Sequence, residues 1–479
     1  MRYLKQLTLI ALLACLFADA GAYDQNPYQT REFAYERSWN FDDYKITTKG
    51  KVDFNYDYTD VIMMGEKAYL KIAKVSKGMT KKLHIGTKDG EILYRYFENN
   101  KELNFDSNGK EWMNAILPVV VRNTGLDLEN RVKRIYADKG LTGFLAEFDH
   151  VSNEYFKERM VDHLLTKQKL SNSELFQLIN HFSSNLKEQN TLGNILQMHS
   201  QKFLKTEELS KVYFTALESL PTSGELSRVM YFIFENNNLA DTNYDRFLNL
   251  IAGMKPGKNR EYHDKSSLVR LLLNDESIDN KKLTKVLSLV DANYKGLERS
   301  QLLTSALDVE NISNENLKTI YLFAKSTSDY EKQSIFQKVL RDELLNPTNY
   351  PQFKEALKTI SEDQTLSMLL TQLVEYQKIG DKKLDDVLEL ADNFSSNRDK
   401  VGFYNKLFYS MDLQDYQQLK ILKKMENVDN QHELTMFLQE AVQSVNLGNE
   451  EIKEKLTELV NKIKEKHQYG MLMRSINQY

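Results

Sequence analysis

One type of helix recurs along most of this chain at nearly constant intervals, and this repeat limits the possible folds more than any other feature. Each copy begins with a bulky apolar residue and continues with apolar residues at helical spacing, as in Leu283–Val290 and Leu384–Ala391. Successive copies start 31 to 38 residues apart. Their first apolar residues are Leu175, Leu209, Phe247, Leu283, Leu317, Phe353, Leu384 and Leu419. A period of this length is typical of tandem two-helix units.

A second helix is predicted in each unit, between these copies. It follows a Ser, Asn or Asp residue and ends in a bulky apolar pair, as in the segments that start at Ser152, Ser183 and Ser326. A side-chain oxygen there accepts hydrogen bonds from the free N–H groups of the first helical turn. Two helices alone cannot bury both apolar faces, whereas a stack of hairpins forms one continuous core. The pattern therefore predicts an α-solenoid of HEAT-like or TPR-like repeats of about 35 residues.

The composition agrees with a mostly helical protein. Glycine and proline are scarce, with 19 and 6 copies in 479 residues, which disfavours a disordered chain or a turn-rich all-β protein. A single hydrophobic core stops growing at roughly 250–300 residues, so more than one domain is expected. The formal net charge of −4 gives no bulk electrostatic case for binding nucleic acid.

Residues 44–105 show a different period. Apolar or aromatic side chains alternate with polar ones from Val52 to Thr59, and a period of two is typical of a half-buried strand. Asp89-Gly90 and Asn99-Asn100 are typical of tight hairpin turns. Further strands are predicted at Tyr69–Val75, Leu83–Ile85 and Ile92–Phe97. Together these segments predict an antiparallel β-meander of about five or six strands.

The predicted fold class is α+β but mostly α, with the β-meander domain followed by the α-solenoid. A helix is expected to open at Asp106, to include Trp112 and to bend at Pro118. A charged helix over 450–467 is expected to cap the repeats, with coiled-coil pairing to a partner as the alternative. The predicted parts are a signal peptide at 1–22, an extended lead-in at 23–43, a β-domain at 44–106, linking helices at 107–150 and a helical-repeat domain at 151–479.

The N-terminus has the three parts of a secretory signal peptide. Arg2 and Lys5 precede an apolar stretch, Leu7–Phe17, which is shorter than the roughly 20 residues of a membrane-spanning helix. Small residues then mark cleavage sites after Ala20 or Ala22. We therefore expect an exported bacterial protein, periplasmic or secreted, with an uncleaved membrane anchor as the alternative. No later segment is apolar over a length that spans a membrane.

The only cysteine, Cys15, lies within this N-terminal segment. Leu12–Cys15 resembles a loose lipoprotein box, which makes Cys15 a candidate for lipid attachment. The bulky Leu13 and the apolar residues after Cys15 favour ordinary cleavage instead. The mature chain would then contain no cysteine and no disulfide, although disulfides are permitted in the exported compartment.

Several segments resemble one bacterial family. They are Val52–Ile62, Phe105-Asp106 with Trp112, Ile116–Gly125, Arg131–Ile135 and Ser152–Arg159. The family is the exported, non-catalytic region that follows the membrane peptidase unit in antirepressor-type metallopeptidases, the class that includes β-lactam sensors. The resemblance implies the fold and the exported location. It does not imply peptidase activity, because a zinc peptidase helix needs His-Glu-x-x-His, and His432-Glu433 is followed by Met436 at the position of the second histidine.

The residues for common chemistries are incomplete. Asp53, Asn55 and Asp57 match the opening of a calcium loop, but the required glycine and glutamate are missing. His150, His163, His181 and His199 fall on successive predicted helices and are interpreted as ordinary histidines. No thiol nucleophile, serine elbow or phosphate-binding loop is present in the mature sequence. No catalytic residue, metal or cofactor is therefore predicted.

The sequence favours an exported interaction scaffold that binds a protein or peptide of the cell envelope through its helical repeats. Trp39, in the predicted lead-in, is a candidate anchor for that partner, and Trp112 is expected to pack between sheet and repeats. Basic pairs such as Lys423-Lys424 are interpreted as solvated helix faces. The alternative is a periplasmic ligand-sensing or regulatory subunit whose β-domain binds a small molecule or cell-wall fragment. A hydrolase with a dispersed active site is the third possibility.

Overall fold

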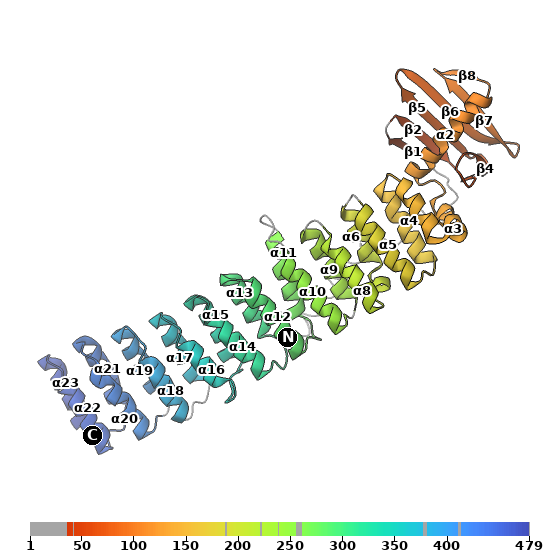
Figure 1. Cartoon of the computed structure of the whole chain (residues 1–479). Helices are drawn as coiled ribbons and strands as arrows, with labels where there is room; N and C mark the ends of the chain where they lie inside the picture. The colour runs from red at the N-terminus through yellow and green to blue at the C-terminus, as the bar shows by residue number, and fades with distance from the viewer. Residues whose placement is uncertain are drawn as a thin grey trace. The chain divides into compact units, whose positions relative to one another are not determined.

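The computed structural model describes residues 36–41, 43–186, 189–220, 223–237, 239–254, 261–376, 381–410 and 413–478. The predicted signal peptide, with Cys15, Ala20 and Ala22, lies outside the described residues. The chain divides into two compact units, Met1–Leu220 and Pro221–Tyr479 (Figure 1).

Unit 1 contains two antiparallel sheets. The larger sheet has six strands in the order β1 (Arg37–Phe41), β2 (Tyr44–Lys49), β5 (Tyr69–Ser76), β6 (Met79–Lys88), β7 (Glu91–Glu98) and β8 (Lys101–Leu103). The smaller sheet pairs β3 (Val52–Phe54) with β4 (Val61–Met64). The predicted meander is confirmed, with the β3–β4 hairpin as an insertion between β2 and β5. Strand β1 lies in the segment that was expected to be an extended lead-in.

Two predicted hairpin turns are confirmed. Asp89 and Gly90 join β6 to β7 with φ values of 55° and 85°, and Asn99 and Asn100 join β7 to β8 with φ values of 46° and 67°. A two-residue turn with both central residues left-handed matches the twist of the flanking strands. Asn, Asp and Gly tolerate this conformation better than other residues.

The prediction of a single strand from Val52 to Thr59 is wrong. Strand β3 ends at Phe54, and Tyr58 is buried in a left-handed conformation with φ of 59°. The Asn55 side chain bonds Thr59 Oγ1 at 2.9 Å and accepts from the Asp60 backbone N–H at 3.0 Å. These local hydrogen bonds close a loop where the alternating pattern alone favoured a strand.

Helix α2 (Ser107–Thr124) covers one face of the six-stranded sheet. Asp106 caps it by accepting hydrogen bonds from the backbone N–H groups of Asn108 and Gly109, as predicted, and Pro118 lies within it. The core between them is formed by Ile46, Leu70, Ile72, Leu83 and Ile85 of the sheet and by Met113, Ile116, Leu117, Val120 and Val121 of the helix. Trp39 and Trp112 are half-buried and pack against this core.

Six further helices complete unit 1. They are α3 (Leu128–His150), α4 (Glu154–Lys167), α5 (Asn172–Asn185), α6 (Gln189–Met198), α7 (Ser200–Phe203) and α8 (Glu207–Glu218). Helix α3 contains a break at Gly140, where φ is 62°. Ser183 lies inside α5, so the helix that was predicted to start there begins later, at Gln189.

Unit 2 is a two-layered stack of helices (Figure 1). The first layer contains α9 (Ser223–Asn236), α11 (Glu261–Leu273), α13 (Gly296–Ala306), α15 (Asp329–Arg341), α17 (Asp363–Tyr376), α19 (Asn397–Ser410), α21 (Gln431–Ser444) and α23 (Lys466–Asn477). The second contains α10 (Asp241–Gly253), α12 (Asn280–Asn293), α14 (Asn314–Ala324), α16 (Tyr350–Leu357), α18 (Asp381–Ala391), α20 (Asp415–Lys424) and α22 (Glu450–Val460). Neighbours within a layer are therefore one repeat apart in sequence.

The repeat prediction is confirmed by burial. The eight predicted apolar anchors lie on eight different helices, and each is at least 91% buried, Leu419 being the most exposed at 9%. The fold is therefore a β-sheet region followed by helical repeats. The predicted terminal helix over 450–467 is wrong, because α22 ends at Val460 and a further helix, α23, follows it. No helix among the described residues is long and apolar enough to cross a membrane.

Candidate functional site

Within unit 2, the first residue of one helix repeatedly binds the segment before the next helix of the same layer. We call these contacts inter-repeat clasps. Asp329, the first residue of α15, accepts from the Ser361 backbone N–H at 2.8 Å, the Ser361 hydroxyl at 2.7 Å and the Glu362 backbone N–H at 2.9 Å. Asp363, the first residue of α17, accepts from the Ser395 backbone N–H at 3.0 Å and the Ser395 hydroxyl at 2.7 Å.

The same contact recurs at the first residue of four further helices, three of them with neutral side chains and one with the carboxylate of Asp415. Asn280 of α12 accepts from the Ser313 backbone N–H at 2.7 Å, and Gln431 of α21 accepts from the Lys464 backbone N–H at 3.0 Å. Asn314 of α14 accepts from the Asn346 and Asn349 amides at 2.7 and 2.9 Å, and Asp415 of α20 accepts from the Asn446 and Asn449 amides, both at 2.9 Å. Each clasp satisfies polar groups in the segment before a helix and fixes the position of adjacent repeats.

The clasp carboxylates are strong acceptors in their charged form. Partial burial raises the pKa of Asp329, but hydrogen bonds from Ser361, Lys332 and Glu362 outweigh it and lower that pKa to about 2. The pKa of Asp363 is likewise lowered, because hydrogen bonds from Ser395 and Ser396 outweigh its desolvation. Hydrogen bonds that stabilise the ionised form lower a carboxyl pKa.

Ion pairs link the helices of the second layer. Lys354 of α16 lies 2.6 Å from Glu389 of α18 and also pairs with Asp386. Lys420 of α20 pairs with Asp385 of α18, and Lys424 of α20 pairs with Asp392, which directly follows α18. Lys423 of α20 lies 3.7 Å from Glu451 of α22, and Lys455 of α22 pairs with Glu426. Acidic and basic side chains thus face one another between neighbouring helices of this layer.

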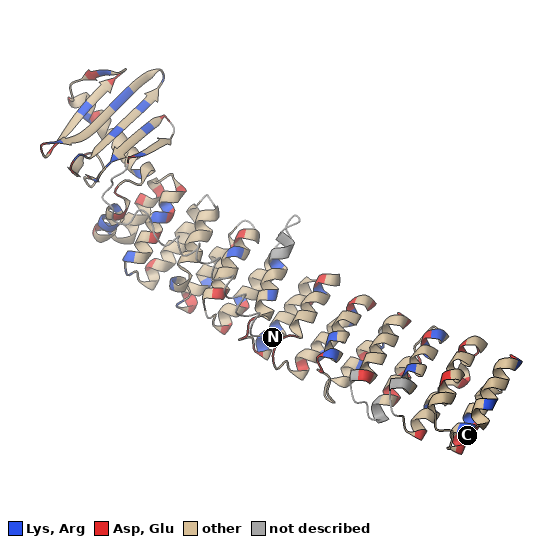
Figure 2. Cartoon of the chain, turned by 180° about the vertical axis from the view of Figure 1, so that it is seen from behind, with Lys and Arg blue, Asp and Glu red and all other residues tan. Residues whose placement is uncertain are grey.

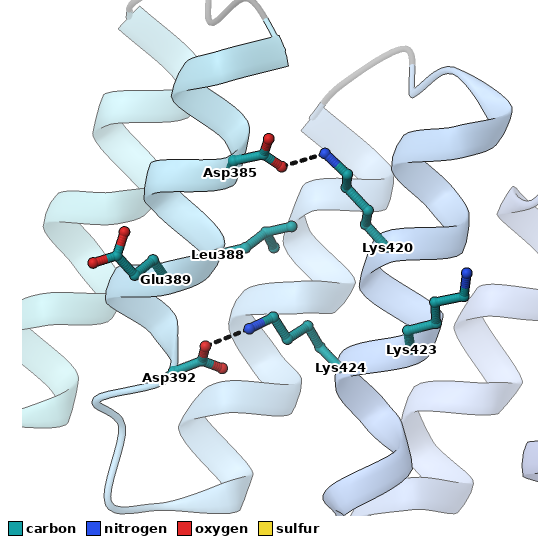
Figure 3. Close-up of a pocket in the computed structure, with 7 residues that line it drawn as sticks. All are labelled: Asp385, Leu388, Glu389, Asp392, Lys420, Lys423 and Lys424. Atoms are coloured by element: carbon teal, nitrogen blue, oxygen red, sulfur yellow. Dashed lines mark hydrogen bonds and ion pairs between the residues drawn. The ribbon is translucent and has the colours of Figure 1, made fainter.

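A groove of about 400 Å³ lies between α18 and α20 (Figure 3). Asp385, Glu389 and Asp392 form its acidic wall, and Lys420, Lys423 and Lys424 form its basic wall. Leu388, which is 3% exposed, lies between them. The ion pairs Asp385–Lys420 and Asp392–Lys424 bridge the groove at two points (Figure 3). The groove therefore offers a small apolar contact between charged walls of opposite sign.

The electrostatics of this groove suit binding rather than proton transfer. Hydrogen bonds from Lys354 and Lys358 lower the pKa of Glu389, and a general acid or base works best with a pKa near the working pH. Its lining contains no histidine, cysteine or serine. Exposed ion pairs of this kind contribute only about 0–1 kcal/mol each to stability. An incoming charged side chain can therefore replace one member of a pair at low cost.

A second charged cluster is buried in unit 1, beneath the sheets. Arg131 is 0% exposed, its Nε lies 3.9 Å from Glu147 and its guanidinium lies 5.5 Å from the centre of the Tyr58 ring. Arg122 forms two hydrogen bonds with Glu147, at 3.1 and 3.0 Å. Burial lowers the pKa of Arg131. Because Arg131 is fully buried, this cluster belongs to the interior of the unit and is interpreted as structural.

The four helix histidines do not converge. His181 lies 2.8 Å from Asp149, His199 lies 3.3 Å from Asp162 and His163 lies 4.0 Å from Glu129, while His150 Nδ1 lies 2.6 Å from the Ala146 carbonyl oxygen. Each histidine therefore has a different partner. Within the described part of the chain, no group of three or more His, Cys, Asp or Glu side chains is placed to hold a metal ion.

Asp53 and Asn55, which belong to the sequence match to a calcium loop, take part in other contacts. Asp53 is 9% exposed and pairs with Lys51 at 2.8 Å, while Asn55 closes the loop after β3. Trp39, the candidate partner anchor, lies on β1 with its side chain half-buried against the core. Trp112 packs on Tyr96, with ring centres 5.5 Å apart. Both tryptophans thus contribute to the sheet core.

The groove was not identified from the sequence, although a signal for it is present. Asp385 and Lys420 are 35 residues apart, and Asp392 and Lys424 are 32 apart, which is close to the repeat length. Opposite charges at this spacing face one another on adjacent helices of a layer. Lys423-Lys424 was interpreted only as a solvated pair, because sequence alone does not show which acids lie opposite.

No family model matches the chain, and no curated protein matches it. Among solved structures, the crystal structure of human Puf-A aligns over 78% of this chain and 92% of that chain, with 9% identity and a TM-score of 0.19. A circular tandem repeat protein with a novel repeat topology aligns over 78% of this chain and 90% of that chain, with 11% identity and a TM-score of 0.17. At such TM-scores the alignments carry no information about this chain's ligand.

Proposed function

We propose that this chain is an exported protein-interaction scaffold of a bacterial cell envelope, and that unit 2 binds a polypeptide segment of its partner between α18 and α20. The observation that supports this most directly is the groove itself, with a buried leucine between an acidic and a basic wall. Repeat proteins bind through extended helix surfaces rather than single deep pockets. A surface groove between adjacent repeats fits that mode.

The chemistry of the groove favours a polypeptide ligand of mixed charge. A basic side chain of the ligand would bind Asp385 or Asp392, and an acidic one would bind Lys420 or Lys424. Tyr416, which is 43% exposed and lies under Lys420 at 5.8 Å, adds an aromatic contact beside the basic wall. Tyrosine is enriched in protein interfaces because it combines a large apolar area with few rotatable bonds.

Export is proposed from the N-terminal sequence, which has a basic start, a short apolar stretch and small residues at Ala20 and Ala22. A non-catalytic role is proposed from the pairing of the groove's charges and from the separate partners of the helix histidines. The alternative, which follows from the family resemblance, is a periplasmic ligand-sensing or regulatory subunit whose β-domain binds a small molecule or cell-wall fragment.

Site-specific photo-crosslinking in cells tests the proposal. A photoreactive residue at Lys423, one of the residues of α20 that line the groove, is expected to capture the same envelope protein reproducibly. The matched control places the residue at Lys281 of α12, which also carries an interhelix ion pair, with Asp241 of α10. Adding K420E and K424E is expected to abolish the crosslink from Lys423. Equal crosslinking at Lys281, or no dependence on Lys420 and Lys424, would contradict the proposal.

A further inference from the structure

The six-stranded sheet has a second face, opposite the one covered by α2. Successive side chains along a strand point to opposite faces, and Ile46, Ile72 and Leu83 point into the core. The neighbours of these residues therefore form the other face, which we call the open face. Its members on the central strands are Lys45, Thr47 and Lys49 of β2, Tyr69, Lys71, Ala73 and Val75 of β5, Lys82, His84 and Gly86 of β6, and Leu93, Arg95 and Phe97 of β7.

By the strand register, the open face includes Lys45, Lys49, Lys71, Lys82 and Arg95. Figure 2 colours the lysine and arginine positions of the strands blue. The strand register places Lys45, Ala73 and Lys82 in one row across the sheet, and Thr47, Lys71, His84 and Arg95 in the next. Lys45, Lys49 and Lys71 are exposed and Lys82 is half-buried. Among the described residues, none of these four lysines forms an ion pair with a carboxylate, and Lys82 donates to the Asn100 side-chain oxygen at 2.6 Å. Their positive charges are therefore not neutralised by the protein.

Among the described residues, the carboxylates of this surface lie at its margins. Glu102, on the edge strand β8, accepts two hydrogen bonds from Arg95, at 2.8 and 2.6 Å. Glu36 precedes the edge strand β1 and binds the Tyr69 hydroxyl, and Glu91 starts β7. The centre of the face is positive. Burial lowers the pKa of His84, and the positive charges of Lys71, Arg95 and Lys82 lower it further.

The aromatic residues of the face argue against a single-stranded nucleic acid. Such ligands need free rings on which bases stack. Phe97 already packs on His84, with ring centres 4.9 Å apart, and lies under the Arg95 guanidinium at 5.3 Å. Lys71 covers Tyr69 at 4.7 Å. Arg95, the one arginine among these cations, is already paired with Glu102. The cations without a carboxylate partner are therefore lysines.

The distribution of these lysines favours a ligand with a flat, negatively charged surface. They lie on three adjacent strands, β2, β5 and β6, and are spread in two dimensions rather than along one line. Two apolar side chains, Val75 at 53% and Leu93 at 43% exposure, also belong to this face. Lysines gain free energy near a surface of anionic lipids, and exposed apolar side chains beside them can enter the headgroup region.

We propose that the open face of the sheet binds the surface of a membrane that contains anionic lipids, and that it holds the chain there as a peripheral protein. The hydrophobic core lies on the covered face of the sheet, so binding of the open face to a membrane requires no unfolding. The binding is electrostatic, and it depends on lysines from β2, β5 and β6 acting together. It is independent of polypeptide binding by the groove, because the two surfaces belong to different units.

Vesicle co-sedimentation of the purified full chain tests this. The probes are vesicles of phosphatidylcholine alone and vesicles of phosphatidylcholine with phosphatidylglycerol. Binding is expected only to the second kind, and it should disappear at about 1 M salt, where charges are screened beyond about 3 Å. K45E/K71E/K82E is expected to weaken binding at least tenfold, and K45Q/K71Q/K82Q to weaken it less. Residues 1–22 are present in every variant, so any binding by that segment is common to all.

The matched control is K205E/K211E/K295E, which makes the same charge change at exposed lysines of helices and loops outside the sheet. It should bind as the unaltered chain does. Circular dichroism checks that each variant is folded. Equal binding to both vesicle types, no binding, or equal losses in the two charge-reversal variants would overturn the proposal. Binding to soluble polyglutamate but not to vesicles would overturn the lipid assignment in favour of an acidic protein.

Discussion

Asp329 and Ser361 lie one repeat apart and are joined by two hydrogen bonds, one from the Ser361 backbone N–H at 2.8 Å and one from its hydroxyl at 2.7 Å. Asp329 starts α15, and Ser361 lies in the segment before α17. The pair therefore connects neighbouring helices of the same layer. The Asp329 side chain is 15% exposed, so water competes only weakly for these contacts.

Removing this clasp is expected to destabilise unit 2. D329A should lower the free energy of unfolding by about 2–3 kcal/mol, because it leaves the Ser361 and Glu362 donors without a charged acceptor. D385A is the matched control, since it removes an exposed interhelix carboxylate and should cost no more than about 1 kcal/mol. Urea unfolding followed by circular dichroism measures both. Equal shifts of the urea midpoint would show that the clasp contributes no more than a surface ion pair.

Lowering the pH is expected to remove the stabilisation that the Asp329 clasp provides. The pKa of Asp329 is about 2 in the folded chain, compared with an ordinary value of 3.8. Because the folded pKa is depressed, the stabilisation is fully present above about pH 4 and is lost as the pH falls towards about 2. It is on the order of 2 kcal/mol, since one pKa unit corresponds to about 1.4 kcal/mol. The difference in urea midpoint between the unaltered chain and D329N should therefore shrink across this range. A difference that stays constant with pH would contradict the assignment.

In the buried cluster of unit 1, removing Glu147 and removing Arg131 should have different effects on stability. E147A leaves Arg131 buried without its nearby charge and removes both hydrogen bonds of Arg122, so it is expected to cost about 3–5 kcal/mol. R131M replaces the buried guanidinium with an apolar chain of similar length and should be neutral or stabilising. Thermal unfolding compares the two variants. A greater loss in R131M than in E147A would mean that the Arg131 charge itself stabilises the fold.

Exchanging the walls of the groove separates stability from binding. The variant D385K/D392K/K420E/K424E keeps opposite charges facing one another across α18 and α20. Its melting temperature should match that of the unaltered chain within a few degrees, because exposed pairs contribute little. The crosslink from Lys423 should nevertheless be lost, since a ligand of fixed charge pattern would meet repulsion on both walls. Retained crosslinking would show that the partner does not recognise these charges.

The repeats could be predicted from sequence because their signal is apolar and periodic. Leu283, Phe353 and the other anchors face the core for the same reason that they recur, since each helix buries one stripe. The hairpin turns at Asp89-Gly90 and Asn99-Asn100 could be predicted because few residues adopt left-handed φ values. These features depend on local residue types, which a single sequence contains in full.

The clasps and the groove depend on which residues of different repeats face one another. Asp329 and Asp385 are two of 68 acidic residues, and no local pattern distinguishes the acceptor of a backbone N–H from a solvated carboxylate. The error at Val52–Thr59 has a related cause. The alternation there is real, but the side-chain bonds of Asn55 close a loop within it, and local hydrogen bonds compete with strand pairing.

The clasps give unit 2 a mechanical property. Each one joins a helix only to the segment before the next helix of its layer, as Asp363 does to Ser395 and Asp415 does to Asn446. A pulling force on the C-terminal end would therefore pass through them in series, and the repeats would detach one at a time rather than together. A scaffold of this kind can yield at its end under load while the repeats behind it keep their structure.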